Sequence, residues 1–210
     1  CGINVEIVHV RTEGDQNQTD PLRQFGGAGL FTREVQRSVL DGDTHIAVHS
    51  LKDLPTESAD GLLLAGIPKR APKFDAILLP DDAPKLTSVK DLPNEARIGT
   101  GSPRRQAQLL HLRPDLRVLE IRGNVDTRIA KLDAGEYDAI VLAEAGLRRL
   151  ELADRISFLI QPPEMYPAVG QGAIGIECRS DDEDVQHVLQ QITDQDVACC
   201  TRAERSLLLA

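Results

Sequence analysis

Residues 97–142 read RIGTGSPRRQAQLLHLRPDLRVLEIRGNVDTRIAKLDAGEYDAIVL, and this stretch decides the fold. Short apolar runs, which predict strands, alternate in it with apolar residues at helical spacing. We predict strands at 97–99, 117–121 and 139–142, and helices at 102–112 and 125–134. Strands and helices that alternate at this pitch are typical of a parallel sheet covered by helices.

Outward from this stretch, the same periodicities place strands at 4–10, 45–48, 62–67, 76–79 and 173–178, and helices at 30–39, 144–150, 183–191 and 195–209. The Pro- and Lys-rich residues 68–73 indicate a crossover between two lobes. We therefore expect one domain at about 1–70 plus 173–191, a second at 74–167, and the start of a third at 195–210.

The composition limits the classes of partner. The 210 residues carry a net charge of −9, with 3% aromatic residues and no Trp, which argues against nucleic-acid binding. No apolar run approaches the roughly 20 residues that a membrane span needs. Residues 97–155 nevertheless hold ten Arg and one Lys against nine acids. Because the planar guanidinium suits carboxylate and phosphate, we expect a small anionic ligand.

The four cysteines, Cys1, Cys178, Cys199 and Cys200, form neither a C-x-x-C pair nor a zinc spacing. Reduced thiols in a cytoplasmic protein are the simplest interpretation. The chain shows no signal peptide and no initiator Met, so we expect the natural N-terminus to lie upstream. Three leucines at 207–209 end a predicted helix facing water, which suggests a truncated C-terminus too.

The strand–turn–helix junction at 99–105, GTGSPRR, has the features of an anion site. Ser102 is the predicted N-cap, and a proline takes the first helical position. Free backbone N–H groups and the helix dipole favour an anion there, and the Thr100 and Ser102 hydroxyls would add donors. The positive charges of Arg104 and Arg105 are unfavourable beside that dipole, by about 0.3–1 kcal/mol each, and a bound anion would offset this cost. The alternative is that both arginines pair with surface acids elsewhere.

Residues 121–128, IRGNVDTR, repeat this design, with a Gly-Asn turn between a strand and a helix. Arg122 would emerge at the carboxyl end of its strand, where ligands of open α/β sheets bind. Arg128 lies about one turn into the helix, where a solvated arginine is also a simple interpretation.

A lysine and a carboxylate follow a predicted strand in THIAVHSLKDLP, residues 44–55. Lys52 and Asp53 could form a surface ion pair. Because the strand is predicted to be buried and the pair falls at its carboxyl end, we favour a functional role. A carboxylate beside a cation would stay ionised at neutral pH, and could stabilise positive charge on a substrate or exchange a proton.

Two glycine-flanked turns complete the candidates. FGGAGLF at 25–31 lacks the full G-x-G-x-x-G pattern and a P-loop Lys, so it indicates a nucleotide only weakly and fits a flexible lid equally well. AVGQGA at 168–173 places Gln171, which offers both a donor and an acceptor, before a predicted strand.

Five runs together resemble the porphobilinogen deaminase family, also called hydroxymethylbilane synthases. They are GGAGLF (26–31), IAVHSLKDLP (46–55), GTGSPRRQAQL (99–109), IRGNVDTRIAKLDAGEYDAIVLAEAGLRRL (121–150) and PAVGQGAIGIECR (167–179), in family order over nearly the whole chain. The resemblance implies two α/β lobes like those of type II periplasmic binding proteins, followed by a third α+β domain. The active cleft would lie between the two lobes, which would be joined by a hinge.

The resemblance also implies a transferase of tetrapyrrole (heme and chlorophyll) biosynthesis, which joins four porphobilinogen units head to tail with loss of ammonia. Asp53 matches the family's catalytic aspartate, which would hold the pyrrole N–H and stabilise its positive charge. The arginines would bind the acetate and propionate groups of the substrate. Residues that match the substrate and cofactor sites are Ser50, Lys52, Thr100, Ser102, Arg104, Arg105, Arg122, Gly123, Arg128, Arg155 and Gln171.

The family's cofactor is a dipyrromethane attached to a cysteine in a Gly-Gly-Cys loop. We expect this loop a few residues after Ala210, outside the chain, and neither Cys199 nor Cys200 matches it. The sequence departs from bacterial relatives, which often have lysines around the first glycine loop, at Gln24 and Ala28. We expect a monomer that binds porphobilinogen but no nucleic acid, membrane or metal, and we expect this chain alone to be inactive.

Two other interpretations stay open. One is a non-enzymatic binding protein of the same two-lobe architecture that holds a small carboxylate. Replacing Asp53 tests it, because a pure anion binder gains nothing from a carboxylate. The other is a degenerate or regulatory homologue, which the activity of the full-length gene product tests.

Overall fold

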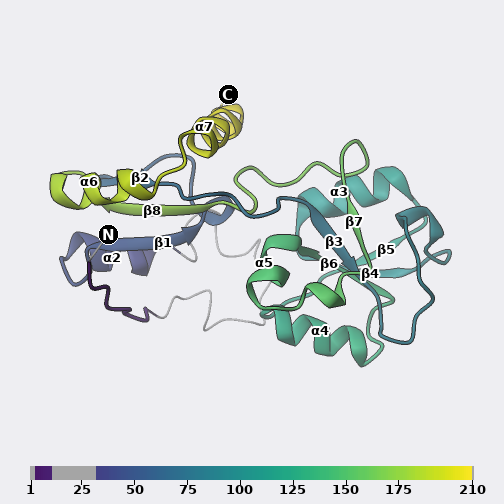
Figure 1. The fold of residues 1–210 in the computed structure, drawn as a ribbon. Helices are drawn as coiled ribbons and strands as arrows, with labels where there is room; N and C mark the ends of the chain where they lie inside the picture. The colour runs from purple at the N-terminus through teal and green to yellow at the C-terminus, as the bar shows by residue number, and fades with distance from the viewer. Residues whose placement is uncertain (1–2, 11–31, 210) are drawn as a thin grey trace. The chain divides into compact units, whose positions relative to one another are not determined.

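The computed structural model describes residues 3–10 and 32–209 (Figure 1). The chain divides into two compact units. Unit 1 consists of Cys1–Lys69 and Ala173–Ala210, and unit 2 of Arg70–Gly172. Each unit has its own sheet and its own hydrophobic clusters. Among the described helices, none combines the length and the apolar character that crossing a membrane requires.

Unit 1 is built on a three-stranded antiparallel sheet in the order β1-β8-β2. Its strands are β1 (Ile46–Ser50), β2 (Leu62–Gly66) and β8 (Ile174–Arg179). Two helices cover its faces, α2 (Arg33–Leu40) and α6 (Glu183–Ile192). Val39 of α2 packs against Ala47, whereas Leu189 of α6 packs against Ile176. The sheet is therefore covered on both sides, as Figure 1 shows.

A third helix, α7 (Gln195–Leu209), packs beside the short helix η2 (Leu51–Asp53) that follows β1. Ala198 of α7 joins Leu51 and Leu54 in one buried cluster. Residues 195–210, which we expected to begin a third domain, thus belong to unit 1 here. The third domain itself stays a prediction.

Two predictions for unit 1 were wrong. Residues 4–10 pair with no described strand, and Ile7, for example, is 77% exposed. Alternating apolar residues supply the side-chain pattern of a strand, but a strand also needs a backbone partner. The strand that we predicted to be buried, β1, lies at the edge of the sheet formed by the described strands, and its Val48 is 57% exposed.

Unit 2 is built on a five-stranded mixed sheet in the order β5-β4-β6-β3-β7. The strands are β3 (Asp75–Leu78), β4 (Arg97–Gly99), β5 (Arg117–Leu119), β6 (Ala139–Ala143) and β7 (Phe158–Ile160). β5, β4 and β6 are parallel, as the alternating pattern predicted. β3 runs antiparallel to β6 and β7, so a strand outside that predicted series makes the sheet mixed. No helical crossover of the βαβ type precedes β3 or links it to β4, so the pattern did not fix its direction.

Three helices cover the two faces of this sheet, α3 (Pro103–Leu112), α4 (Val125–Asp133) and α5 (Glu144–Arg149). Leu109 of α3 packs in one cluster with Val141, and Leu132 of α4 packs in the other with Ile140. Because consecutive strand residues point to opposite faces, α3 and α4 lie on opposite sides of the sheet (Figure 1). Short helices η3 and η4 occupy Val89–Asp91 and Ala153–Arg155.

Candidate active site

The first candidate region is the turn after β1 in unit 1, which carries Ser50, Lys52 and Asp53. Leu51 anchors this turn, because its side chain is buried and its N–H donates to the carbonyl of Ala173 at 3.0 Å. Lys52 and Asp53 follow in η2 and are both exposed. The turn therefore presents a cation and a carboxylate side by side on unit 1.

The pKa of the Asp53 carboxyl reflects two opposing effects. Burial of the carboxyl by the protein atoms around it raises its pKa above the ordinary value, and outweighs the attraction of Lys52 and His49. The residue keeps accessible surface, so this burial is crowding around the carboxyl and not full enclosure. The attraction of the neighbouring Lys52 is therefore a smaller effect on the pKa of Asp53 than burial is. A raised pKa suits a carboxyl that exchanges protons.

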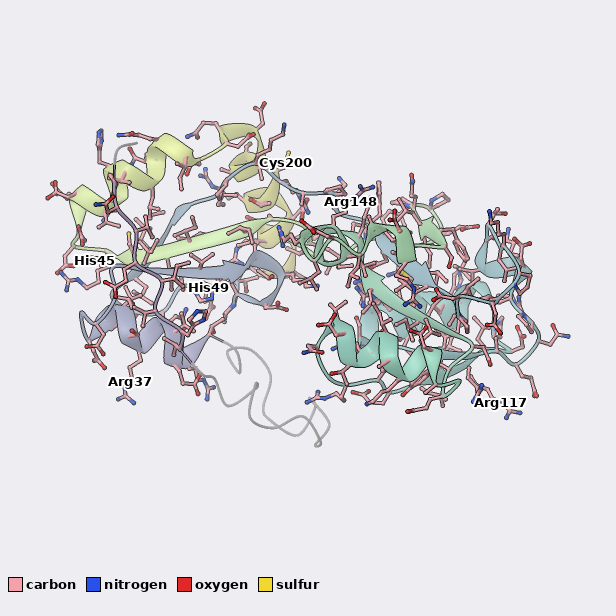
Figure 2. The ribbon with its side chains drawn as sticks, turned by 60° about the horizontal axis from the view of Figure 1, so that its bottom comes forward. Arg37, His45, His49, Arg117, Arg148 and Cys200 are labelled. Atoms are coloured by element: carbon pink, nitrogen blue, oxygen red, sulfur yellow. The ribbon has the colours of Figure 1, made fainter. Side chains whose placement is uncertain are left out.

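Beside this turn, His49 of β1 belongs to a buried polar group (Figure 2). Its Nε2 lies 3.0 Å from Oε2 of Glu177 in β8. The side-chain amide of Gln36 in α2 donates to the same carboxylate oxygen at 2.8 Å. His49 is therefore a core residue of unit 1.

The second candidate region lies at the carboxyl ends of β4 and β5 in unit 2. Ser102 caps α3, as predicted, by accepting the N–H of Arg105. Thr100 Oγ1 accepts the N–H of Ser102 at 3.2 Å. In both contacts the hydroxyl oxygen is the acceptor, so each O–H group can still donate to a ligand.

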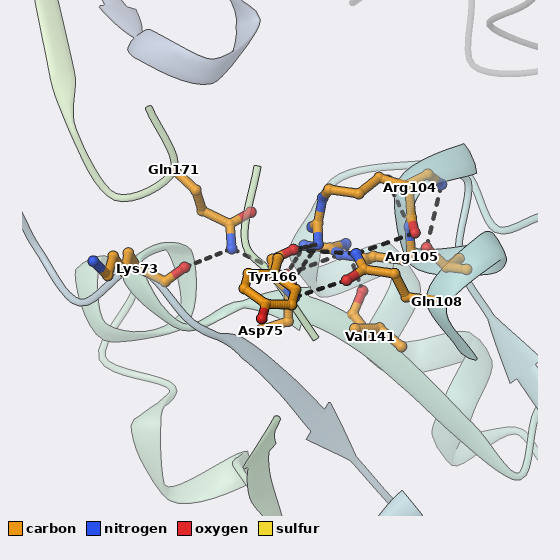
Figure 3. A network of polar contacts seen from close by, with 10 residues as sticks. Lys73, Asp75, Arg104, Arg105, Gln108, Val141, Tyr166 and Gln171 are labelled. Atoms are coloured by element: carbon orange, nitrogen blue, oxygen red, sulfur yellow. Dashed lines mark hydrogen bonds and ion pairs between the residues drawn. The ribbon is translucent and has the colours of Figure 1, made fainter. Parts of the chain in front are cut away.

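The two arginines of this junction meet an anion that belongs to the protein, Asp75 at the start of β3 (Figure 3). Arg104 Nη1 lies 2.8 Å from Oδ2 of Asp75, and Arg105 Nη2 lies 2.8 Å from Oδ1. Because Asp75 is only 1% exposed, the alternative that both arginines pair with surface acids is wrong. Arg105 also donates to the carbonyl of Val141 at 2.9 Å, so this buried side chain has a structural role within unit 2.

Gln171 completes this network. Its Nε2 donates to the carbonyl of Lys73 at 2.7 Å and to Oδ1 of Asp75 at 3.1 Å. Burial pushes the pKa of Asp75 upward, but Arg105, Arg104 and Gln171 outweigh it and hold that pKa below the ordinary value. Asp75 is therefore ionised at neutral pH, and its one negative charge faces two guanidinium groups.

A further concentration of positive charge follows β5. The Nη1 atom of Arg122 is buried and has no hydrogen-bond partner among residues 3–10 and 32–209. Arg128 Nε donates to the carbonyl of Gly123 at 2.8 Å. Burial, then Arg105, then Arg122 lower the pKa of Arg128, and Glu120 only partly opposes them. These guanidinium groups lie within electrostatic reach of one another, which favours binding of an anion.

Gly123 allows this arrangement of the turn after β5. Its φ is +108°, in the region that favours glycine. A Cβ atom there would lie 2.7 Å from the side chain of Thr127, the residue whose N–H is capped by Asn124. The turn that carries Arg122 therefore depends on a residue without a side chain at this position.

Arg155 lies apart from this group. Its Nη2 lies 2.6 Å from Asp133 and its Nε lies 3.0 Å from Asp81. Hydrogen bonding to Asp133 raises its pKa. The proposed contact of Arg155 with substrate therefore stays a prediction. The glycine loop at 25–31, with the positions Gln24 and Ala28, lies outside the described residues.

Sequence reasoning missed two buried carboxylates, Asp75 and Glu177. Asp75 ends the polar stretch before β3, and its partners follow 29 and 30 residues later in α3. The available signal was indirect: two cations in the first turn of a helix require an anion somewhere. No local pattern identified which acid supplies it.

Comparisons with known proteins place the chain in one family. Residues 2–187 match the family model described as "Porphobilinogen deaminase, dipyromethane cofactor binding domain". The porphobilinogen deaminase of Syntrophotalea carbinolica is 45% identical over 99% of this chain and 64% of its own length. The chloroplastic porphobilinogen deaminase of Euglena gracilis is 48% identical over 96% of this chain and 43% of its own length. The chain therefore spans two thirds or less of these relatives.

Among solved structures, a putative methionine-binding lipoprotein from Bacillus subtilis has a TM-score of 0.50 at 14% identity. The similarity covers 77% of this chain and 75% of that protein, and concerns the fold alone. The predicted α/β class with lobes like those of periplasmic binding proteins is confirmed. The family model and the relatives together show that this chain belongs to the porphobilinogen deaminase family.

Proposed function

We propose that the full-length protein joins four porphobilinogen units head to tail, with loss of ammonia, to give hydroxymethylbilane. The observation that carries this proposal is the arginine group of unit 2. Porphobilinogen bears an acetate and a propionate, and the unpartnered Nη1 of Arg122 is a buried donor suited to a carboxylate. Burial, and then the charges of Arg105 and Arg122, lower the pKa of Arg128, and a bound carboxylate would oppose this effect.

The residues present also fit the dipyrromethane cofactor, whose two pyrroles carry the same carboxylate groups. Arg122, Arg128 and the free O–H groups of Thr100 and Ser102 would hold those carboxylates. When bound, the cofactor supplies the pyrrole carbon to which the first substrate unit is joined. We assign its attachment to a cysteine beyond Ala210, because neither Cys199 nor Cys200 matches the family's attachment loop.

Asp53 would act on the substrate itself. The C–N bond of the aminomethyl group breaks as ammonia leaves, and the resulting azafulvene carries positive charge on its pyrrole nitrogen. Asp53 would accept a hydrogen bond from that N–H and stabilise the charge as it forms. Lys52, next to it on the turn, would bind a substrate carboxylate.

Three further features belong to this proposal. The described cysteines, Cys178, Cys199 and Cys200, are free, which fits a reducing compartment such as the cytoplasm. We also propose a monomer, and we propose that neither nucleic acid nor membrane takes part.

The test is the intact mass of the full-length gene product before and after adding porphobilinogen. We expect a resting mass excess of two pyrrole units, followed by a ladder of increments of one substrate unit each. A bare polypeptide mass without a ladder would leave a carboxylate-binding relative and would overturn the proposed catalysis.

Replacing Arg122 with Met is expected to raise the KM for porphobilinogen about 10- to 100-fold, because a charged hydrogen bond contributes about 1.5–3 kcal/mol. Steady-state kinetics of the full-length protein measures this. Arg117→Met is the matched control, because Arg117 pairs with Glu95 at the surface of the same sheet (Figure 2). An unchanged KM in Arg122→Met would contradict the role of Arg122 in carboxylate binding.

A further inference from the structure

The turn that carries Asp53 is held by a residue distant in sequence, Arg205 of α7. Its Nη1 donates to the carbonyl of Leu54 at 3.1 Å. Its Nη2 donates to the carbonyls of Pro55 and Thr56, at 2.5 and 3.1 Å. One guanidinium therefore binds three consecutive carbonyls directly after Asp53.

Residues 54–56 belong to no helix or strand, so their carbonyls take part in no regular helix or sheet hydrogen bonding. Arg205 is only 9% exposed, so its donors are withdrawn from water and directed at this backbone. A guanidinium presents five N–H donors in a rigid fork, whereas a lysine ammonium is a compact point charge on a flexible stem. Arginine is therefore suited to fixing the path of this segment.

The strand that precedes Asp53 in the sequence is held by other buried side chains. His49 contacts the buried carboxylate of Glu177 at 3.0 Å, and Gln36 donates to that same carboxylate at 2.8 Å. Burial lowers the pKa of Arg205 while Glu177 raises it, so this carboxylate also lies within electrostatic reach of Arg205. The turn is thus bound on both sides of Asp53 by buried side chains.

We propose that Arg205 is a positioning residue for Asp53. By fixing the three carbonyls that follow, its guanidinium determines where the carboxylate of Asp53 stands relative to the substrate. Helix α7 then contributes to catalysis as well as covering the core. This inference rests on the proposed function, because the catalytic role of Asp53 does.

The test separates positioning from simple stabilisation by means of a double-mutant cycle in the full-length protein. Arg205→Lys is measured alone and together with Asp53→Glu, which keeps a carboxylate displaced by one methylene and so leaves residual turnover to measure. We expect Arg205→Lys to lower kcat about 10- to 100-fold, because small misplacements of reacting groups have effects of this size. We expect KM to change less than about twofold, because a group that acts only in the transition state changes kcat.

In the Asp53→Glu background, Arg205→Lys is expected to lower kcat by no more than about twofold, because residues that act as a unit are not additive. Arg202→Lys is the matched control, since Arg202 is exposed on the same helix. It should leave kcat unchanged in both backgrounds.

Equal losses of kcat in both backgrounds, or no loss at all, would overturn the positioning role. Arg205→Gln, which keeps neutral N–H donors, is the second variant if Arg205→Lys does not fold. If neither folds, Arg205 serves stability and the proposal fails. Absence of turnover in the unmodified protein would instead mean that the proposed function fails, so the two failures are distinguishable.

Discussion

Replacing Asp53 with Asn is expected to lower the rate of hydroxymethylbilane formation about 100- to 1,000-fold, the usual effect of removing one group that stabilises transition-state charge. Asn keeps the size of the side chain and can still accept a hydrogen bond, but it carries no negative charge. Because the positive charge develops only as ammonia leaves, the KM for porphobilinogen should change little. Steady-state kinetics of the full-length protein measures both quantities.

The matched control is Asp60→Asn, which removes an exposed carboxylate from the segment between η2 and β2. It should leave kcat and KM unchanged. If Asp53→Asn has no more effect than this control while porphobilinogen still binds, the catalytic assignment fails. The protein would then be the non-enzymatic binding protein of the same architecture, which gains nothing from a carboxylate at this turn.

The raised pKa of Asp53 gives a second readout for the same variant. The proposed function requires the ionised form, so turnover should fall as pH decreases through a pKa above the ordinary aspartate value of about 3.9. Asp53→Asn should lack that acid limb. A folded-state pKa above the unfolded one means that ionisation of Asp53 opposes folding at higher pH. The Asn variant should therefore melt no lower than the unmodified protein, which separates lost chemistry from lost structure.

Local signals in the sequence predicted the elements of the fold well. The N-caps Ser102 and Asn124 accept the N–H groups of Arg105 and Thr127, so both helices begin where the sequence places them. Capping depends on residues within one turn of each other, which a sequence displays directly. The direction of β3 depends on which strands it pairs with, and those lie more than sixty residues away in β6 and β7. Periodicity carries no information about such pairing.

In the candidate site, too, some residues could be recognised from local sequence and others depend on partners distant in the chain. Asp53 and Arg122 were found because each follows a strand in sequence, and ligands of α/β proteins bind at strand ends. Asp75, by contrast, is bound by side chains from two segments distant in sequence, namely Arg104 and Arg105 of α3 and Gln171. The sequence predicted that an anion offsets the two arginines, and the fold supplies that anion from within.

Replacing Asp75 with Asn is expected to destabilise unit 2 strongly. It removes the one carboxylate that faces Arg104 and Arg105, and leaves the buried Arg105 without its countercharge. Breaking a buried ion pair in this way costs about 3–5 kcal/mol. Hydrogen exchange of the full-length protein measures this locally. Amide protection in β3 and β6 should fall at least about 100-fold, whereas β1 and β8 of unit 1 should change far less.

Glu95→Gln is the control for the Asp75 variant. Glu95 is 65% exposed and its partner Arg117 is 60% exposed, and such surface ion pairs contribute little to the free energy of unfolding. The pKa of Asp75 also predicts how the stability of unit 2 changes with pH. The pKa of Asp75 is lower in the folded state, so its stabilising effect is fully present above the unfolded value of about 3.9 and is lost as pH falls through the folded one. Loss of protection in β3 on acidification should therefore be steeper in the unmodified protein than in Asp75→Asn. Equal slopes, or protection in Asp75→Asn equal to that in Glu95→Gln, would show that the two arginines do not depend on this carboxylate.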